Sequence, residues 1–220
     1  MQSRRAAIYG GTFDPVHNGH LKVARGVRKL FELDEVILIP ACVPPHKRGA
    51  GITSAFHRFA MLALATEHDD NVSVSTVELD RPDHPYAVDT VARLREKMGS
   101  DYRLFFVMGA DSWSEITTWR EWQRLLTMCD HIVVTRPGYE LPADAGRGKM
   151  IDVRGKEAGA VQSVINESES TQVFVTDAVF EDVSATTIRA AVKNGRLADL
   201  KTMVPPEVAN YIEKYELYRN

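Results

Sequence analysis

The 220-residue sequence contains no apolar stretch that approaches the roughly 20 consecutive residues a membrane-spanning helix needs. The apolar run near its start, residues 6–9, is too short for a secretory signal and leads directly into two glycines. We therefore expect no membrane partner.

Cysteine is also scarce. Cys42 and Cys129 lie far apart in the chain and form neither a CxxC motif nor a disulfide-rich pattern. Two such residues are typical of reduced thiols in a cytosolic protein, so we expect a cytoplasmic location.

Excess charge of either sign is missing as well. The 27 Lys and Arg residues nearly balance the 30 Asp and Glu residues, which gives a formal net charge of −3. Without a broad positive field, nucleic acid is not an expected partner, and a phosphate ligand must be bound by a local cluster of residues. A content of 44% hydrophobic and 26% charged residues indicates a globular chain with a packed core.

Strand-like and helix-like segments alternate along most of the sequence. The expected strands are 5–9, 36–39, 72–76, 104–108, 131–135 and 173–176, and the expected helices between them are 21–31, 56–64, 88–98 and 119–128. Such alternation predicts an α/β fold with a doubly wound, Rossmann-like parallel sheet. Ligands of such sheets bind beyond the carboxyl ends of the strands, so the loops there are the expected site.

We expect a single domain over 1–220, with a core at about 4–136 and a variable excursion at about 139–172. One helical face, 161–165, is visible within that excursion. The C-terminal motif and a small helical part are expected to follow, at about 173–220. This segment holds a helix capped by Ser184 and a terminal helix opened by Pro205 and Pro206.

The most informative stretch joins the first strand to the first helix. It reads Gly10-Gly11-Thr12-Phe13-Asp14-Pro15-Val16-His17-Asn18-Gly19-His20. Glycines allow close approach to the backbone, and the N-terminus of the following helix favours an anion. His17 and His20 are three residues apart, so both can face the same pocket and donate hydrogen bonds to phosphate.

Three other interpretations of this loop stay open on the residues alone. A dinucleotide-binding loop is one, although G-x-G-x-x-G is absent. A metal site at the two histidines would need at least one further ligand. The last is a structural turn with incidental histidines.

The H-x-G-H pattern at 17–20, preceded by Gly-Gly-Thr-Phe-Asp-Pro, resembles the nucleotidyltransferase superfamily related to class I aminoacyl-tRNA synthetases. More narrowly, the chain resembles the bacterial nicotinate-nucleotide adenylyltransferases. Further matching motifs are Val43-Pro44-Pro45-His46-Lys47, Gly109-Ala110-Asp111-Ser112, Thr118-Trp119, Arg136-Pro137-Gly138, Ser184-Ala185-Thr186-Thr187-Ile188-Arg189 and Val204-Pro205-Pro206. They are spread in order over nearly the whole chain, so the resemblance is specific.

The resemblance implies transfer of AMP from ATP to nicotinate mononucleotide, with release of pyrophosphate, in NAD biosynthesis. The residues expected to act in catalysis are His17, His20 and Arg189. Those expected to bind ATP are Gly10, Gly11, Thr12, Phe13, Asp111, Arg136, Ser184 and Thr186. Mg²⁺ is expected to arrive with ATP, because the sequence shows no dedicated carboxylate cage.

Plain structural roles compete with some of these assignments. Ser184 fits an ordinary helix cap followed by a surface arginine, and Asp111 fits another helix cap. Arg136 fits a surface salt bridge.

The acceptor is expected at Trp119, His46, Lys47, Tyr86 and Thr90. Trp119 would stack on the pyridine ring; a core tryptophan and a solvated loop tip at Lys47 are the alternatives.

One position departs from the family, because Ala87 stands where a threonine hydroxyl is usual. Nicotinamide mononucleotide therefore stays open as the acceptor. A pantetheine-phosphate-type adenylyltransferase and a non-catalytic nucleotide-binding module also stay open, as do a monomer and a homo-oligomer.

Overall fold

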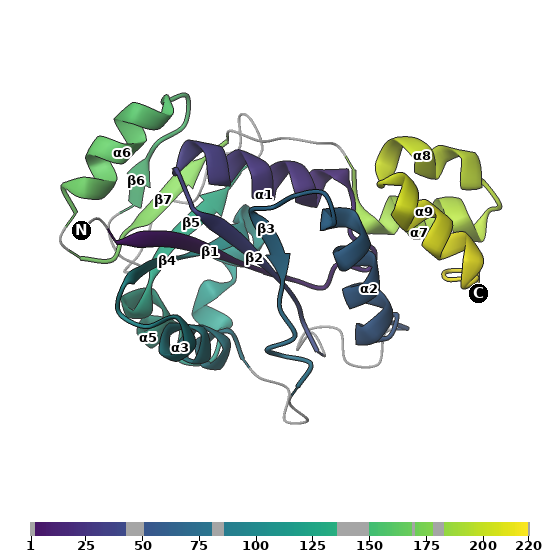
Figure 1. The fold of residues 1–220 in the computed structure, drawn as a ribbon, viewed down its shortest axis with the longest axis horizontal. Helices are drawn as coiled ribbons and strands as arrows, with labels where there is room; N and C mark the ends of the chain where they lie inside the picture. The colour runs from purple at the N-terminus through teal and green to yellow at the C-terminus, as the bar shows by residue number, and fades with distance from the viewer. Residues whose placement is uncertain are drawn as a thin grey trace.

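The computed structural model describes residues 3–42, 51–80, 86–135, 150–168, 170–177 and 183–219. Its centre is a parallel sheet in the order β3-β2-β1-β4-β5-β7-β6 (Figure 1). The strands are β1 (Arg4–Gly11), β2 (Glu35–Pro40), β3 (Val72–Val74), β4 (Tyr102–Gly109), β5 (Asp130–Val134), β6 (Met150–Asp152) and β7 (Val173–Thr176). The predicted doubly wound α/β sheet is confirmed.

Helices cover both faces of the sheet. They are α1 (Asn18–Leu30), α2 (Ala55–Thr66), α3 (Ala87–Met98), α4 (Ala110–Ser114), α5 (Trp122–Met128), α6 (Ala158–Asn166), α7 (Ala185–Lys193), α8 (Leu200–Met203) and α9 (Pro206–Lys214), with 3₁₀ turns η2 (Ile116–Thr118) and η3 (Leu197–Asp199). One buried cluster joins the sheet to α1, α2, α6 and the C-terminal helices, and a second joins it to α3, α4 and α5. Because both faces are covered, the central strands are apolar on both sides, as in Val36-Ile37-Leu38-Ile39.

The chain reverses its direction of travel across the sheet at β1. From β1 it proceeds to β2 and β3 on one side, and later to β4, β5 and β7 on the other. The carboxyl ends of β1 and β4, at Gly11 and Gly109, therefore flank the topological switch point, where ligands of such sheets bind.

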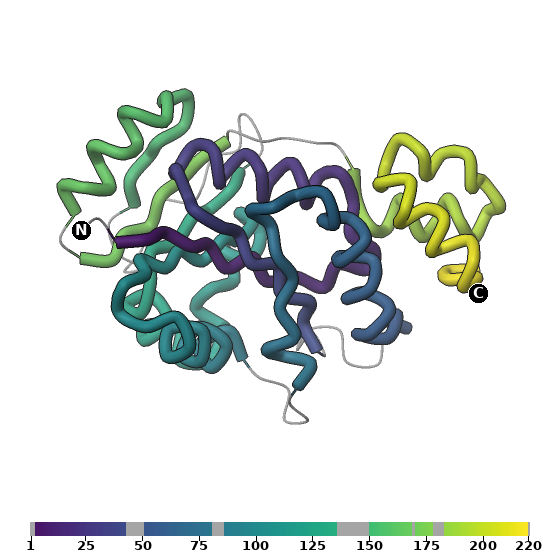
Figure 2. Tube along the Cα trace, viewed as in Figure 1, coloured from purple at the N-terminus to yellow at the C-terminus, as the bar shows by residue number. Residues whose placement is uncertain are grey.

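The C-terminal helices α7, α8 and α9 gather at the end of the molecule toward which β1 runs (Figures 1 and 2). The start of α1 contacts them, since the side-chain amide of Asn18 donates to the Thr202 carbonyl at 3.0 Å. This small helical part agrees with the prediction, including the Ser184 cap, whose hydroxyl accepts from the Thr187 amide. In the described part of the chain, no helix is long and apolar enough to cross a membrane.

Two sequence predictions of secondary structure were incomplete. The excursion contains α6 where one helical face was predicted, but it also contains the unpredicted edge strand β6. Three residues are too few for an alternating pattern to appear. The helix expected from Trp119 begins only at Trp122, because Glu121 adopts a left-handed conformation with φ of 50°.

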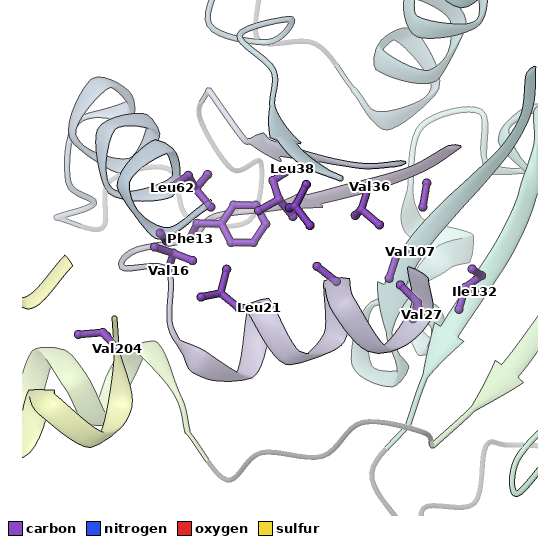
Figure 3. Close-up of a cluster of buried hydrophobic side chains, with 14 of the residues drawn as sticks. Phe13, Val16, Leu21, Val27, Val36, Leu38, Leu62, Val107, Ile132 and Val204 are labelled. Carbon is purple, nitrogen blue, oxygen red and sulfur yellow. The ribbon is translucent and has the colours of Figure 1, made fainter. Parts of the chain in front are cut away.

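Phe13 fixes the chain as it leaves β1. Its backbone has φ of 48°, and its ring lies in the buried layer near Leu38 and Leu62 (Figure 3). The same ring covers Gly11, where a Cβ would lie 2.9 Å from the Phe13 Cζ atom. Gly11 is therefore needed for close approach of the aromatic ring to the last residue of β1.

Gly11→Ala is expected to lower the free energy of unfolding by about 1–3 kcal/mol, because the Phe13 ring must move out of a packed layer. Thermal unfolding measures this as a fall of roughly 2–4 °C per kcal/mol. Gly109→Ala is the matched control, since a Cβ there meets no described atom within 4 Å. Equal unfolding midpoints for the two variants would contradict the account.

Candidate active site

The two histidines of the loop lie together at the start of α1. His17 is the N-cap residue and His20 stands in the first turn, and their rings stack with centroids 3.6 Å apart. The backbone N–H of His17 donates to Nδ1 of His20 at 3.2 Å. Since Nδ1 accepts, the proton of neutral His20 belongs on Nε2, which is thereby available as a donor.

Burial controls the charge of this pair. It lowers the pKa of His17 to about 4 and holds the pKa of His20 well below its usual value, with the neighbouring imidazole as a further cause for His20. Both rings are therefore neutral at pH 7 in the ligand-free protein. An anionic ligand beside them would favour the charged form and raise both pKa values.

The second motif meets this loop directly. Arg189, on α7, donates from Nη1 to the Asp14 carbonyl oxygen at 2.7 Å, although the two residues are 175 positions apart. Its Nη2 donates to the Thr186 hydroxyl at 3.2 Å. The histidine loop and the serine–arginine helix tip therefore lie in direct contact, and Ser184 performs the ordinary capping role.

Asp14 connects the loop to two further parts of the chain. Its side chain is buried, and its carboxylate accepts from the Tyr218 hydroxyl at 2.7 Å and from the Thr53 amide at 3.3 Å. Burial and the Asp14 carboxylate raise the pKa of Tyr218, so its hydroxyl keeps its proton and remains a donor. The C-terminal residues thus close one side of the loop.

Asp111 lies beyond the carboxyl end of β4, across the switch point from Gly10 and Gly11. The cap of α4 is Gly109, and Asp111 occupies the first turn with an exposed side chain. The alternative of Asp111 as the helix cap is therefore wrong. Its carboxylate is open to a ligand at the place where a parallel sheet binds one.

Three of the predicted acceptor residues lie on the α3–α5 side of the sheet. Trp119 is partly buried and meets Phe106 edge-on, with ring centroids 6.2 Å apart. The fully buried tryptophan of this layer is Trp113, whereas Trp119 packs against the core with part of its side chain exposed. Tyr86 lies close by, because the guanidinium of Arg120 sits 4.9 Å from the centre of its ring.

Thr90 is placed differently from the other two. It is 2% exposed, and its hydroxyl donates to Oε1 of Glu78 at 2.8 Å and lies 3.3 Å from the Tyr86 carbonyl. Both hydrogen-bond partners of the Thr90 hydroxyl belong to the protein. Thr90 therefore acts on the predicted acceptor side indirectly, through its hydrogen bond to Glu78. His46, Lys47 and Arg136 lie outside the described residues.

Sequence reasoning missed two charged residues beside the site. Arg58 is 1% exposed, and Glu78 is half-buried with its pKa raised by burial. Arg58 lies on a helix and Glu78 follows a short strand, and neither residue belongs to a sequence motif that indicates a function. A charged residue within the apolar helical pattern at 55–66 was the available signal for Arg58.

The donor set does not include a ready-made metal cage. Within the described ranges, no group of three or more His, Cys, Asp or Glu residues is placed to hold a metal ion. The carboxylate of Asp14 is already engaged by two donors, whereas that of Asp111 is exposed. These residues fit a cation held mainly by the phosphates of a nucleotide and by water.

Comparison with known proteins identifies the family. Residues 8–191 match the cytidylyltransferase-like family. A probable nicotinate-nucleotide adenylyltransferase of Thermoanaerobacter sp. (strain X514) is 38% identical over 215 residues, covering 98% of this chain and 94% of that protein. Another of that name, from Mycolicibacterium vanbaalenii, is 34% identical over 219 residues, covering 100% and 94%.

Solved structures agree on the fold. The nicotinic acid mononucleotide adenylyltransferase of Plasmodium falciparum, complexed with NaAD, superposes with a TM-score of 0.71 at 19% identity, covering 98% of this chain and 97% of that one. The family match and the sequence relatives show that the chain belongs to the cytidylyltransferase-like family and, within it, to the nicotinate-nucleotide adenylyltransferases.

Proposed function

We propose that this protein transfers the adenylyl group of ATP to nicotinate mononucleotide, giving nicotinate adenine dinucleotide and pyrophosphate in NAD biosynthesis. The observation that carries the proposal is the contact between Arg189 and the Asp14 carbonyl, which joins both superfamily motifs at the switch point. The names of the relatives supply the acceptor.

The chemistry needs no nucleophile from the protein. A phosphate oxygen of the mononucleotide forms a bond to the α-phosphorus of ATP, and the bond from that phosphorus to the bridging oxygen breaks. Pyrophosphate leaves with the electron pair. Because the attacking oxygen is already anionic, catalysis depends on positioning and on stabilising the charge that develops on the phosphates.

The triphosphate is assigned to the loop after β1 and to the tip of α7. In this proposal Nε2 of His20 donates to a phosphate oxygen, and His17 becomes charged as the ligand raises its pKa. Arg189, already held by Asp14, adds a fixed positive charge, and the Ser184 and Thr186 region closes the other side. The backbone of residues 10–13 flanks the phosphates, and the exposed carboxylate of Asp111 accepts from a ribose hydroxyl.

A divalent cation, taken here as Mg²⁺, neutralises phosphate charge when bound with ATP. No protein carboxylate is assigned to the cation, which is expected to be held by the phosphates of ATP and by water.

The acceptor ring is assigned to the exposed part of Trp119, near Tyr86. Stacking there buries ring area and adds cation–π attraction of about 0.5–2 kcal/mol for a pyridinium. Two further assignments rest on the family resemblance alone. His46 and Lys47 are assigned to the mononucleotide, with its phosphate at Lys47, and Arg136 is assigned to ATP. Ala87 begins α3 without a hydroxyl, which makes nicotinamide mononucleotide the specific competitor.

Pyrophosphate release tests the activity. The protein with Mg²⁺ and ATP is expected to release pyrophosphate with nicotinate mononucleotide, and less with nicotinamide mononucleotide. Phosphopantetheine serves as the acceptor control and is expected to give none. Release with phosphopantetheine alone, or with no acceptor at all, contradicts the proposal.

Replacing His20 tests the role of the imidazole pair. His20→Ala is expected to lower kcat by about 10²–10³, with smaller changes in KM, because a preorganised donor to the reacting phosphates is lost. His68→Ala, whose side chain is 87% exposed, is the matched control and should match the wild-type rate. Wild-type turnover by the His20 variant would remove the assignment.

A further inference from the structure

Arg58 is a buried cation held by backbone carbonyl groups. It lies in the first turn of α2 and is 1% exposed. Its guanidinium donates to four carbonyl oxygens, which are those of Thr53 (2.9 Å), Thr12 (2.7 Å), Ala41 (2.7 Å) and Cys42 (3.2 Å). Burying a charged group costs free energy unless its donors are satisfied. These four hydrogen bonds supply that satisfaction for the Arg58 guanidinium.

Three of these four carbonyl groups belong to the two loops that the proposed function assigns to the two substrates, and the fourth, that of Thr53, lies just before α2 itself. Thr12 follows β1, in the loop assigned to the triphosphate. Ala41 and Cys42 follow β2 and lead into the Val43–Lys47 motif assigned to the acceptor phosphate. The loops leave the sheet side by side, because Gly11 pairs with Pro40 and the Ala41 amide donates to the Gly11 carbonyl at 2.9 Å.

Glu78 holds Cys42 from its other side. The Cys42 amide donates to Oε2 of Glu78 at 3.3 Å, while the Cys42 carbonyl accepts from Arg58. The other carboxylate oxygen, Oε1, accepts from the hydroxyl of Thr90, on α3. Cys42, the residue just before the acceptor motif, is therefore held through both its N–H and its C=O.

We propose that Arg58 is a positioning residue that fixes the triphosphate loop and the acceptor loop relative to each other, with Glu78 fixing the acceptor side at Cys42. This inference rests on the proposed function. In-line displacement requires the attacking oxygen to lie close to the α-phosphorus and opposite the leaving group, and a misplacement of about 1 Å costs roughly 10² in rate. One guanidinium that bonds both loops sets that distance without touching either substrate.

The shape of the guanidinium is essential to this role. Its planar fork sends hydrogen bonds in several fixed directions, whereas a lysine ammonium is a single point with three donors. Arg58→Lys keeps the charge and cannot reach all four carbonyls. Arg58→Met keeps much of the apolar length and reaches none.

The test separates binding from turnover. Dissociation constants for ATP alone and for nicotinate mononucleotide alone are measured by calorimetry, and kcat is measured at saturation. Arg58→Met is expected to keep each dissociation constant within about threefold of the wild-type value while kcat falls by roughly 10². In Arg58→Lys, kcat is expected to fall by about tenfold or more. Arg25→Met, an exposed arginine of α1, is the matched control and keeps the wild-type kcat.

Thermal unfolding of each variant identifies simple loss of the fold. Should neither Arg58 variant fold, Glu78→Gln keeps the test open, because it leaves the buried cation in place. It is expected to lower kcat by about tenfold with the affinity for ATP unchanged, against Glu67→Gln as its exposed control. A folded Arg58 variant with wild-type kcat overturns the proposal. A loss of rate that disappears when one substrate is raised to saturation also overturns it, because such a loss reflects weaker binding.

Hydrogen exchange distinguishes failure of this inference from failure of the proposed function. In Arg58→Lys, the amides of Ala41 and Cys42 are expected to exchange faster while those of α1 are unchanged. Wild-type protein that releases no pyrophosphate would refute the function, and this exchange pattern would still establish that Arg58 holds the loops. Unchanged exchange at both amides in the variant contradicts the positioning role itself.

Discussion

The hydrogen bond from Arg189 to the Asp14 carbonyl is the contact on which the candidate site depends. It joins the loop that leaves the first strand to a helix near the end of the chain. The segment after the last helix reinforces this junction, since the Tyr218 hydroxyl donates to the carboxylate of Asp14. Asp14 therefore holds the Arg189 guanidinium through its carbonyl oxygen and the Tyr218 hydroxyl through its carboxylate.

The parallel sheet determines why these groups converge. Strands β1 and β4 end next to each other at the switch point, so the loops after Gly11 and Gly109 leave the same edge of the sheet as neighbours. Burial keeps the stacked imidazoles of His17 and His20 neutral in the free protein. Among the described residues, Arg189 and buried Arg58 are two arginines that donate hydrogen bonds to the backbone of this loop.

Much of the fold and part of the site were predictable because they depend on local patterns. The apolar runs of β1, β2 and β4 and the serine cap of α7 are visible in a few consecutive residues. Edge strand β6 was not predictable, because three residues carry too little pattern. The late start of α5 follows from one left-handed residue, Glu121, which sequence does not indicate.

Contacts between distant segments explain what was missed in the site. Arg58 bonds carbonyl groups, and a carbonyl group has no sequence signature, so nothing in the chain indicates that this arginine bridges two loops. The internal partner of Thr90 was hidden for the same reason, since Glu78 is twelve positions away and on another element. Motif reasoning predicts which groups face a ligand, whereas the structure reveals contacts between distant segments that hold the loops.

The central claim is that the two motifs act on one triphosphate, and pyrophosphate affinity tests it most directly. Pyrophosphate binding to the wild-type protein and to Arg189→Ala is measured by calorimetry with Mg²⁺ present. The account predicts that the dissociation constant rises by roughly tenfold or more in the variant, as expected for a lost charge-assisted contact of about 1.5–3 kcal/mol. Equal affinity in a folded variant would show that Arg189 serves only to hold the loop, and would contradict the account.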